Sequence, residues 1–177
     1  MSQKSVAPTP LRSANYPLPA AASLFDGLVS QVALEEPARL EPPGSWVEHI
    51  PFAFWMMEAL QPERFVELGT HSGNSYLAFC QAGSALKQEV QCFAVDTWKG
   101  DPQAGFYGEE VFERLLAYHD RHYGHFSRLI RSTFDEARHS FATGAIEMVC
   151  SKSGVLHVPI RRNSILWYRQ RQRLERD

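Results

Sequence analysis

The sequence contains few of the features that mark disulfide-rich, membrane or nucleic-acid-binding proteins. Its 177 residues include only three cysteines, Cys80, Cys92 and Cys150, whose wide spacing favours reduced core thiols over a disulfide framework or a zinc site. A formal net charge of -2 gives no field that would gather nucleic acid or hold an anionic membrane surface. No apolar run is long enough to span a bilayer, and residues 1–19 lack the apolar segment of a secretory signal. We therefore expect a cytoplasmic setting, with neither nucleic acid nor membrane as a partner.

Length and composition favour one domain with an extended start and an atypical end. A hydrophobic fraction of 44% is enough to build one sizeable core. Residues 1–19 carry four prolines and few large apolar groups, so we expect a disordered or extended arm there. The expected division is this arm, a compact domain at residues 20–149 and a basic tail at residues 150–177.

Hydrophobic spacing predicts two helices followed by alternating strands and helices. The first two helices are expected at residues 20–34 and 46–60. Large apolar side chains of the second helix are expected to be mostly buried: Phe52, Phe54, Trp55, Met56, Met57 and Leu60. Strands then follow at Phe65–Leu68, Val90–Val95, Phe126–Ile130 and Ile146–Val149, and helices from about Tyr76, over Gly108–His122 and over Phe134–Phe141. This order is typical of an α/β protein with a Rossmann-like doubly wound parallel sheet, here preceded by N-terminal helices and incomplete at its C-terminal end.

The segment FVELGTHSGNS places two glycines directly after the first expected strand. Gly69 and Gly73 lie where this strand meets the following helix, at the edge of a doubly wound sheet where ligands bind. Without side chains they let a ligand approach the backbone, and the helix that starts near Asn74 points unpaired N–H groups at it. The turn therefore suits a carboxylate or a phosphate.

An acidic residue stands in register with this turn. Asp96 ends the second expected strand, 23 residues after Gly73, where a carboxylate can accept hydrogen bonds from both hydroxyls of a ribose. The dinucleotide fingerprint has a third glycine in the middle of the turn, and His71 stands in its place. Nicotinamide and flavin cofactors are therefore disfavoured, and a nucleotide-sugar or dinucleotide-binding enzyme is the weaker alternative.

The motifs around the turn resemble one enzyme family. An acidic residue, one intervening residue, glycine, three residues and another glycine resemble the first motif of class I S-adenosylmethionine-dependent methyltransferases. The stretches FVELGTHSGNSYLAFCQA and FAVDTWKGDPQAGFYGEEVF, with Trp46–Trp55, are similar to a bacterial type often found beside or fused to glycosyltransferases. The resemblance covers residues 46–149. It implies S-adenosyl-L-methionine as cofactor and methyl transfer to a hydroxyl group of a small molecule or a saccharide.

The resemblance also implies which residues hold this cofactor. They are Glu67, Gly69, Thr70, His71, Gly73, Asp96, Thr97 and Trp98. Glu67 and the glycine turn would hold the methionine part, Asp96 the ribose, and the two residues after Asp96 would border the adenosine. The loop Lys99–Gly108 would lie over the pocket.

The chain departs from the family pattern at the fourth expected strand. In the family this strand continues into a histidine-isoleucine-aspartate-glycine segment that resembles a base or metal site, whereas residues 149–154 here read VCSKSG. No catalytic residue is therefore identified. Residues 150–174 carry six Lys or Arg and no acidic residue, which fits either a shortened sheet capped by a basic helix at residues 165–174 or a tail foreign to the fold. We favour a foreign tail, because a sheet ending at its fourth strand leaves one side of the core uncovered and an edge open for association.

Two expectations follow for activity and for metals. Without acceptor-side residues we expect a weakly active or inactive protein, and a non-catalytic Rossmann-like fragment is the alternative to an enzyme. Seven histidines raise the question of a metal, and His119, His122 and His125 lie close together. Their spacing puts only two on one helical face with no cysteine nearby, so we expect solvated surface side chains and no metal site.

Overall fold

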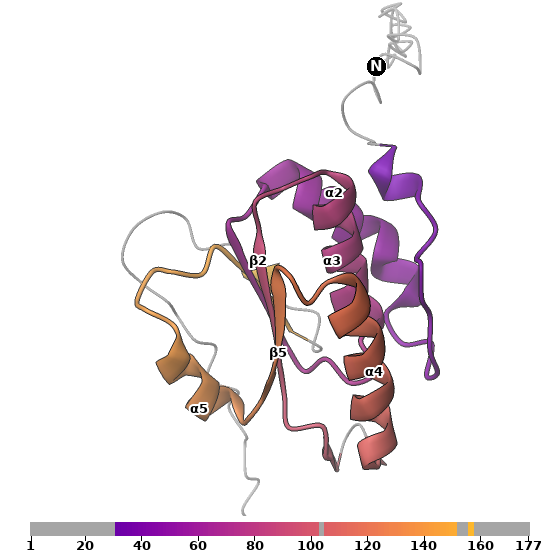
Figure 1. Cartoon of the computed structure of the whole chain (residues 1–177), viewed down its shortest axis with the longest axis vertical. Helices are drawn as coiled ribbons and strands as arrows, with labels where there is room; N and C mark the ends of the chain where they lie inside the picture. Colours follow the sequence, from indigo (N-terminus) through magenta and orange to yellow (C-terminus); the bar gives the residue numbers. More distant parts are fainter. Residues whose placement is uncertain (1–30, 103–104, 152–155, 158–177) are drawn as a thin grey trace, which may run out of the picture.

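The computed structural model describes residues 31–102, 105–151 and 156–157 (Figure 1). Its elements in chain order are η1 (Val32–Leu34), η2 (Val47–His49), α2 (Ile50–Leu60), β1 (Arg64–Leu68), α3 (Asn74–Ala85), β2 (Gln91–Asp96), β3 (Gly100–Asp101), β4 (Gly105–Phe106), α4 (Glu109–His122), β5 (Ser127–Arg131), α5 (Phe134–Ala137), η3 (Arg138–Ser140), β6 (Met148–Ser151) and β7 (Leu156–His157). The expected arm, most of the first expected helix and most of the basic tail lie outside the described residues. None of the described helices is long and apolar enough to cross a membrane.

One sheet contains its strands in the order β5-β2-β1-β6-β7. β1 is parallel to β2 and β6, β2 is parallel to β5, and β7 is antiparallel to β6. Figure 1 shows α2, α3 and α4 on one face of this sheet and α5 on the other. The crossovers therefore diverge between β1 and β6, which is where a doubly wound sheet opens a crevice for a ligand. The predicted Rossmann-like α/β fold is confirmed.

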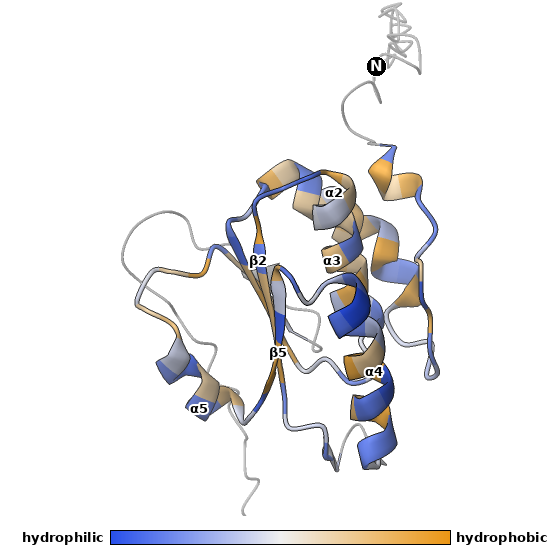
Figure 2. Ribbon diagram, viewed as in Figure 1, coloured by the Kyte–Doolittle hydropathy of each residue, from blue (hydrophilic) through white to orange (hydrophobic). Residues whose placement is uncertain are grey.

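Each face of the sheet carries a buried apolar layer, because successive strand residues point to opposite sides. In β1, Phe65 packs against Phe79 of α3 with ring centroids 4.3 Å apart. Its neighbour Val66 belongs to a smaller cluster on the opposite face, with Ala137 and Ile146. Figure 2 shows hydrophilic and hydrophobic residues alternating along α4, as expected for a helix with only one face on the sheet.

α2 buries one stripe of its apolar surface. Its buried residues are Ile50, Ala53, Phe54, Met56 and Met57. Phe52, Trp55 and Leu60 are 45%, 37% and 37% exposed, which contradicts the prediction that they are buried with the rest. The reason is that α2 packs mainly on α3 and η1, so its outer side has no described neighbour to cover it.

The fourth parallel strand differs from its predicted limits. β6 runs over Met148–Ser151, so the domain boundary expected between residues 149 and 150 falls inside the strand. Cys150 is 4% exposed and pairs with Glu67 of β1, and it therefore belongs to the core. The outer edge of β6, expected to be open, carries β7 over two residue pairs. A strand of only two residues has no periodic pattern, so the pairing of β7 with β6 could not be predicted from the sequence.

The two sides of α2 provide a matched pair of variants. Phe54→Ala, at a side chain with 0% exposure, should lower the free energy of unfolding by about 3–5 kcal/mol, because it removes buried apolar area and leaves a cavity. Phe52→Ala, on the exposed side, should lower it by less than about 1 kcal/mol. Urea unfolding of both variants beside the wild type measures the difference. Equal losses would contradict the described packing of α2.

Candidate functional site

The turn between β1 and α3 has the backbone geometry that its glycines allow. Gly69 and Gly73 have φ angles of 85° and 87°, and His71 between them has 53°. At Gly73 a side chain would also collide with α4, because a Cβ built there lies 2.5 Å from Cδ1 of Leu115. This glycine therefore lets α4 pack against the turn, a requirement that sequence reasoning missed.

Asp96 holds the turn from the end of the neighbouring strand. Its Oδ2 accepts hydrogen bonds from the backbone N–H groups of Thr70 (2.8 Å) and His71 (2.9 Å), and its Oδ1 accepts one from the N–H of Trp98 (2.8 Å). The residue is 8% exposed. The structure thus brings Asp96 and the glycine turn together and gives the carboxylate a bracing role. Its contact with a ribose stays a prediction.

Trp98 lies beneath the turn. It is 1% exposed, and its ring packs against Phe112 with centroids 4.8 Å apart. Its Nε1 donates a hydrogen bond to the carbonyl oxygen of His71 at 2.9 Å. An indole this deeply buried packs as part of the core, and its contact with adenosine stays a prediction. Trp98 is a second brace of the turn.

The loop after Trp98 returns to the turn. β3 and β4 pair as a short antiparallel hairpin, and Tyr107 follows directly after β4. Its ring lies edge to face with that of His71, with centroids 4.3 Å apart. His71 is therefore held at its carbonyl by Trp98 and at its ring by Tyr107, so both its backbone and its side chain are fixed in the turn.

Two further predicted residues lie at the ends of β1 and β2. Glu67 is 1% exposed and pairs with Cys150 of β6. Burial, and secondarily the charge of Glu67, raise the pKa of the Cys150 thiol, so this thiol stays protonated at neutral pH. Thr97 follows β2, and its carbonyl oxygen accepts a hydrogen bond from Nε of Arg131 at 3.3 Å.

Polar groups of the turn are left available to a ligand. α3 begins after Gly73, which has no side chain to accept from the first N–H groups, and within the described residues no side-chain cap is found at this end of the helix. These N–H groups and the helix dipole favour negative charge at this point. Oγ1 of Thr70 is buried and makes no hydrogen bond within the described part of the chain. The uncapped helix and the buried hydroxyl together fit a small anionic ligand.

A hollow of about 340 Å³ lies away from this turn, lined by residues 61–63 and 86–89. These residues lead into β1 and β2, so the hollow is at the amino end of the sheet. Ligands of doubly wound sheets bind at the carboxyl ends of the strands, and we assign no function to this hollow. Within the described ranges, no three His, Cys, Asp or Glu residues are placed to hold a metal ion.

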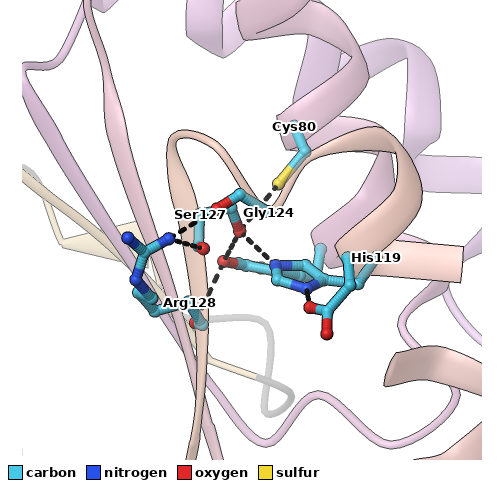
Figure 3. A network of polar contacts seen from close by, with 7 residues as sticks. Cys80, His119, Gly124, Ser127 and Arg128 are labelled. Carbon is cyan, nitrogen blue, oxygen red and sulfur yellow. Dashed lines mark hydrogen bonds and ion pairs between the residues drawn. The ribbon is translucent and has the colours of Figure 1, made fainter. Parts of the chain in front are cut away.

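A buried polar network joins α3, α4 and β5 (Figure 3). His119 bonds through Nε2 to Oγ of Ser127 at 2.8 Å and through Nδ1 to Oδ1 of Asp120 at 2.8 Å. The hydroxyl of Tyr76 lies 2.5 Å from Oγ of Ser127, and the thiol of Cys80 donates to the same oxygen at 3.7 Å. His119 is 2% exposed, so the prediction that it is a solvated surface residue is wrong. His122 and His125 are exposed, as predicted.

The order of aspartate, histidine and serine in this network resembles a hydrolase triad, but its position argues against catalysis. Ser127 is 0% exposed, so no substrate reaches its hydroxyl. It is the first residue of β5 and lies at the end of the sheet opposite the glycine turn. The network instead satisfies polar groups that the packing of α3 and α4 has buried.

Comparison with known proteins gives a family, a relative and several solved structures. Residues 66–158 match the family described as Methyltransferase domain. The uncharacterized protein y4gI of Sinorhizobium fredii (strain NBRC 101917 / NGR234) is 48% identical over 118 residues, which are 67% of this chain. These residues are only 13% of that relative, so the chain spans a small part of the length of the curated protein it matches.

Among solved structures, cofactor-bound Rv0187 from MTB has a TM-score of 0.46 and 13% identity, over 78% of this chain and 56% of that one. The SAH-bound Podospora anserina methyltransferase PaMTH1 has a TM-score of 0.46 and 14% identity, over 76% of this chain and 59% of that one.

The buried histidine gives the stability a predicted pH dependence. Burial lowers the pKa of His119 below its ordinary 6.5, although the hydrogen bond to Asp120 opposes this shift. Below about pH 6.5 the histidine of the unfolded chain is protonated, whereas that of the folded chain stays neutral. The free energy of unfolding therefore decreases as the pH is lowered, until the pH falls below the folded-state pKa. The free energy of unfolding of the wild type should decrease as the pH is lowered from 8 to 5. His119→Gln should show a smaller decrease, because the contribution of His119 is removed.

The matched control is His125→Gln, at an exposed side chain near the same helix end. It should change the free energy of unfolding by less than about 0.5 kcal/mol, because surface substitutions away from packed or bonded features have small effects. A His119→Gln variant whose slope equals that of the wild type would show that His119 does not titrate differently on folding.

Proposed function

This chain belongs to the methyltransferase domain family, and on that premise we propose that it binds S-adenosyl-L-methionine at the turn between β1 and α3. We propose a hydroxyl group of a small molecule or a saccharide as the methyl acceptor. The observation that carries the cofactor assignment is the uncapped start of α3 beside the buried hydroxyl of Thr70. It supports binding of the amino-acid part of the cofactor, since carboxylates are stabilised at helix N-termini.

The residues of the turn would act by holding the cofactor in place. When bound, this cofactor supplies a methyl group activated by a sulfonium, so in-line displacement needs positioning and no protein nucleophile. Gly69 and Gly73 would let it approach the backbone, and the buried carboxylate of Glu67 would attract its amino group. Asp96 and Trp98 would keep the turn in the binding geometry through their bonds to its backbone.

We assign no residue to the removal of the acceptor proton. A hydroxyl acceptor must give its proton to a general base or be activated by a metal ion. At the end of β6, where the family pattern has histidine and aspartate, the described residues are Cys150 and Ser151. The raised pKa of Cys150 argues against a thiolate base. We therefore propose that this chain binds the cofactor but transfers the methyl group weakly or not at all.

The setting and the partners are part of the same proposal. Cys80, Cys92 and Cys150 are free and buried, which supports a reducing, cytoplasmic setting. We propose no nucleic-acid or membrane partner. Association with another chain would use the edge of the sheet beyond β6, where the described residues of β7 pair with β6 at two positions.

Cofactor binding is tested by calorimetry with S-adenosylmethionine, S-adenosylhomocysteine and NAD. Both adenosyl compounds should bind saturably and NAD should not. Asp96→Ala should weaken binding by roughly 1–3 kcal/mol, because the turn loses the acceptor of its Thr70 and His71 N–H groups. Saturable binding of NAD alone would reverse the order of the cofactor hypotheses, and no binding of any compound would favour the non-catalytic fragment.

Gly69→Val and Gly144→Val form a matched pair for locating this site. The two glycines have φ angles of 85° and 76°, so valine is strained at either position. Gly144 lies in the loop before β6, at the opposite end of the sheet from the glycine turn. Gly69→Val should weaken binding of S-adenosylhomocysteine at least tenfold, whereas folded Gly144→Val should bind like the wild type. Equal affinities in both variants would place the pocket elsewhere.

Turnover is tested by incubating the full chain with S-adenosylmethionine and a panel of sugars and small hydroxyl compounds. We expect cofactor binding without robust formation of S-adenosylhomocysteine, because no described group is placed to take the acceptor proton. Robust turnover that Lys152→Ala or His157→Ala abolishes would contradict this expectation and give the segment after β6 a catalytic role.

A further inference from the structure

An irregular segment at residues 36–43, which we call the strap, is fastened along α3 by two carboxamide side chains. The first is Gln81, whose Oε1 accepts a hydrogen bond from the N–H of Ala38 at 2.8 Å. Its Nε2 donates one to the carbonyl oxygen of Glu36 at 3.0 Å. The same side chain thus satisfies a donor and an acceptor of a backbone that forms no regular secondary structure.

The second carboxamide is Asn74, at the start of α3 and two helical turns before Gln81. Its Oδ1 accepts from the N–H of Glu41 at 2.9 Å, and its Nδ2 donates to the carbonyl oxygens of Glu41 (2.8 Å) and Pro43 (3.3 Å). Because the later part of the strap meets the earlier part of the helix, the two run in opposite directions. The strap therefore ends beside the glycine turn.

Prolines favour an extended conformation at both fastening points. Glu36 precedes Pro37 and Glu41 precedes Pro42, and a residue before proline is disfavoured in helical geometry. Pro37 and Pro42 also have no N–H group that would need a partner. The strap is thus a stiff segment whose remaining backbone groups are available to the carboxamides of α3.

Arg39 connects the strap to the glycine turn, between the two fastening points. Its Nη1 donates to the carbonyl oxygen of Ser72 at 2.8 Å. The side chain is 10% exposed, its Nη2 lies 3.5 Å from Oε1 of Glu41, and its guanidinium lies 5.4 Å from the centroid of the Tyr118 ring. Burial lowers the pKa of Arg39, with the charge of Glu41 opposing that shift.

The peptide unit between Ser72 and Gly73 is held by two hydrogen bonds, one at its carbonyl and one at its N–H group. The Ser72–Gly73 peptide is planar, so its carbonyl and its N–H point in opposite directions. The carbonyl accepts from Arg39, and the N–H of Gly73 donates to the carbonyl oxygen of Thr70 at 2.9 Å. Glycine at position 73 would otherwise allow this peptide to rotate.

We infer that the end of the strap beside the turn, residues 39–43, positions the turn, and that Arg39 acts through the Ser72 carbonyl to set the affinity for the adenosyl cofactor. Arg39 is a positioning residue, because it acts on the peptide that leads into α3. The affinity part of the inference rests on the proposed function. The coupling between strap and turn does not, and it is measured first and without any ligand.

Amide hydrogen exchange of the ligand-free chain tests the coupling. Arg39→Met keeps the apolar stem but removes the donor, and it should raise exchange of the amides of residues 70–73 several-fold. Arg39→Lys keeps a donor and a charge and should recover part of the protection. Gln81→Ala unfastens the far end of the strap and should raise exchange around residues 36–38 but not at the turn.

Calorimetry with S-adenosylhomocysteine tests the affinity. Arg39→Met should bind roughly tenfold more weakly than the wild type, while Gln81→Ala should lower the melting temperature and bind like the wild type. Equal loss of affinity in both variants would show that the strap affects binding only through the stability of the domain, and would overturn the inference. Turn amides that exchange alike in wild type and Arg39→Met would overturn it as well, whether or not a ligand binds. Failure of the wild type to bind any adenosyl compound would instead overturn the proposed function together with the affinity role of Arg39.

Discussion

The Asp96 carboxylate is the interaction on which the candidate site depends. It accepts hydrogen bonds from the backbone N–H groups of Thr70, His71 and Trp98, and so joins the ends of β1 and β2 to one turn. A carboxylate that accepts several N–H bonds in a mostly buried place holds its partners strongly, because each bond is charge-assisted. Without it, the buried N–H groups of Thr70 and His71 would lose their acceptor.

Buried polar groups have their hydrogen bonds satisfied at one end of the sheet but not at the other. Near the amino end of β5, hydrogen bonds join Ser127 to His119 and to Tyr76, so these buried side chains need no ligand as a partner. At the carboxyl end of β1, the start of α3 is uncapped and Oγ1 of Thr70 has no hydrogen bond in the described structure. A fold that satisfies one buried cluster completely and leaves another available makes the second cluster the better candidate for function.

The sequence predicted elements better than it predicted contacts. β1, β2, α4 and β5 begin and end within about two residues of their expected limits, and α3 begins within two, because each has a clear period bounded by turn residues. The exposed Phe52, the buried His119 and the placement of Trp98 in the core were missed, since each depends on which element lies opposite. No pattern within one segment carries that information. The packing of Gly73 on Leu115 is of the same kind, since the two residues lie on different elements.

The sequence by itself determined the α/β order, the glycine turn after the first strand and the acidic residue at the end of the second. These follow from local periodicity and from residue types, such as glycine, whose effect on the backbone does not depend on distant parts of the chain. Only the tertiary structure decided that Asp96 bonds to the turn, that Arg39 reaches Ser72 and that the carboxamides of Asn74 and Gln81 fasten the strap. Each of these bonds joins residues 25 to 45 positions apart, and a hydrogen bond across that distance exists only after packing has brought its donor and acceptor together.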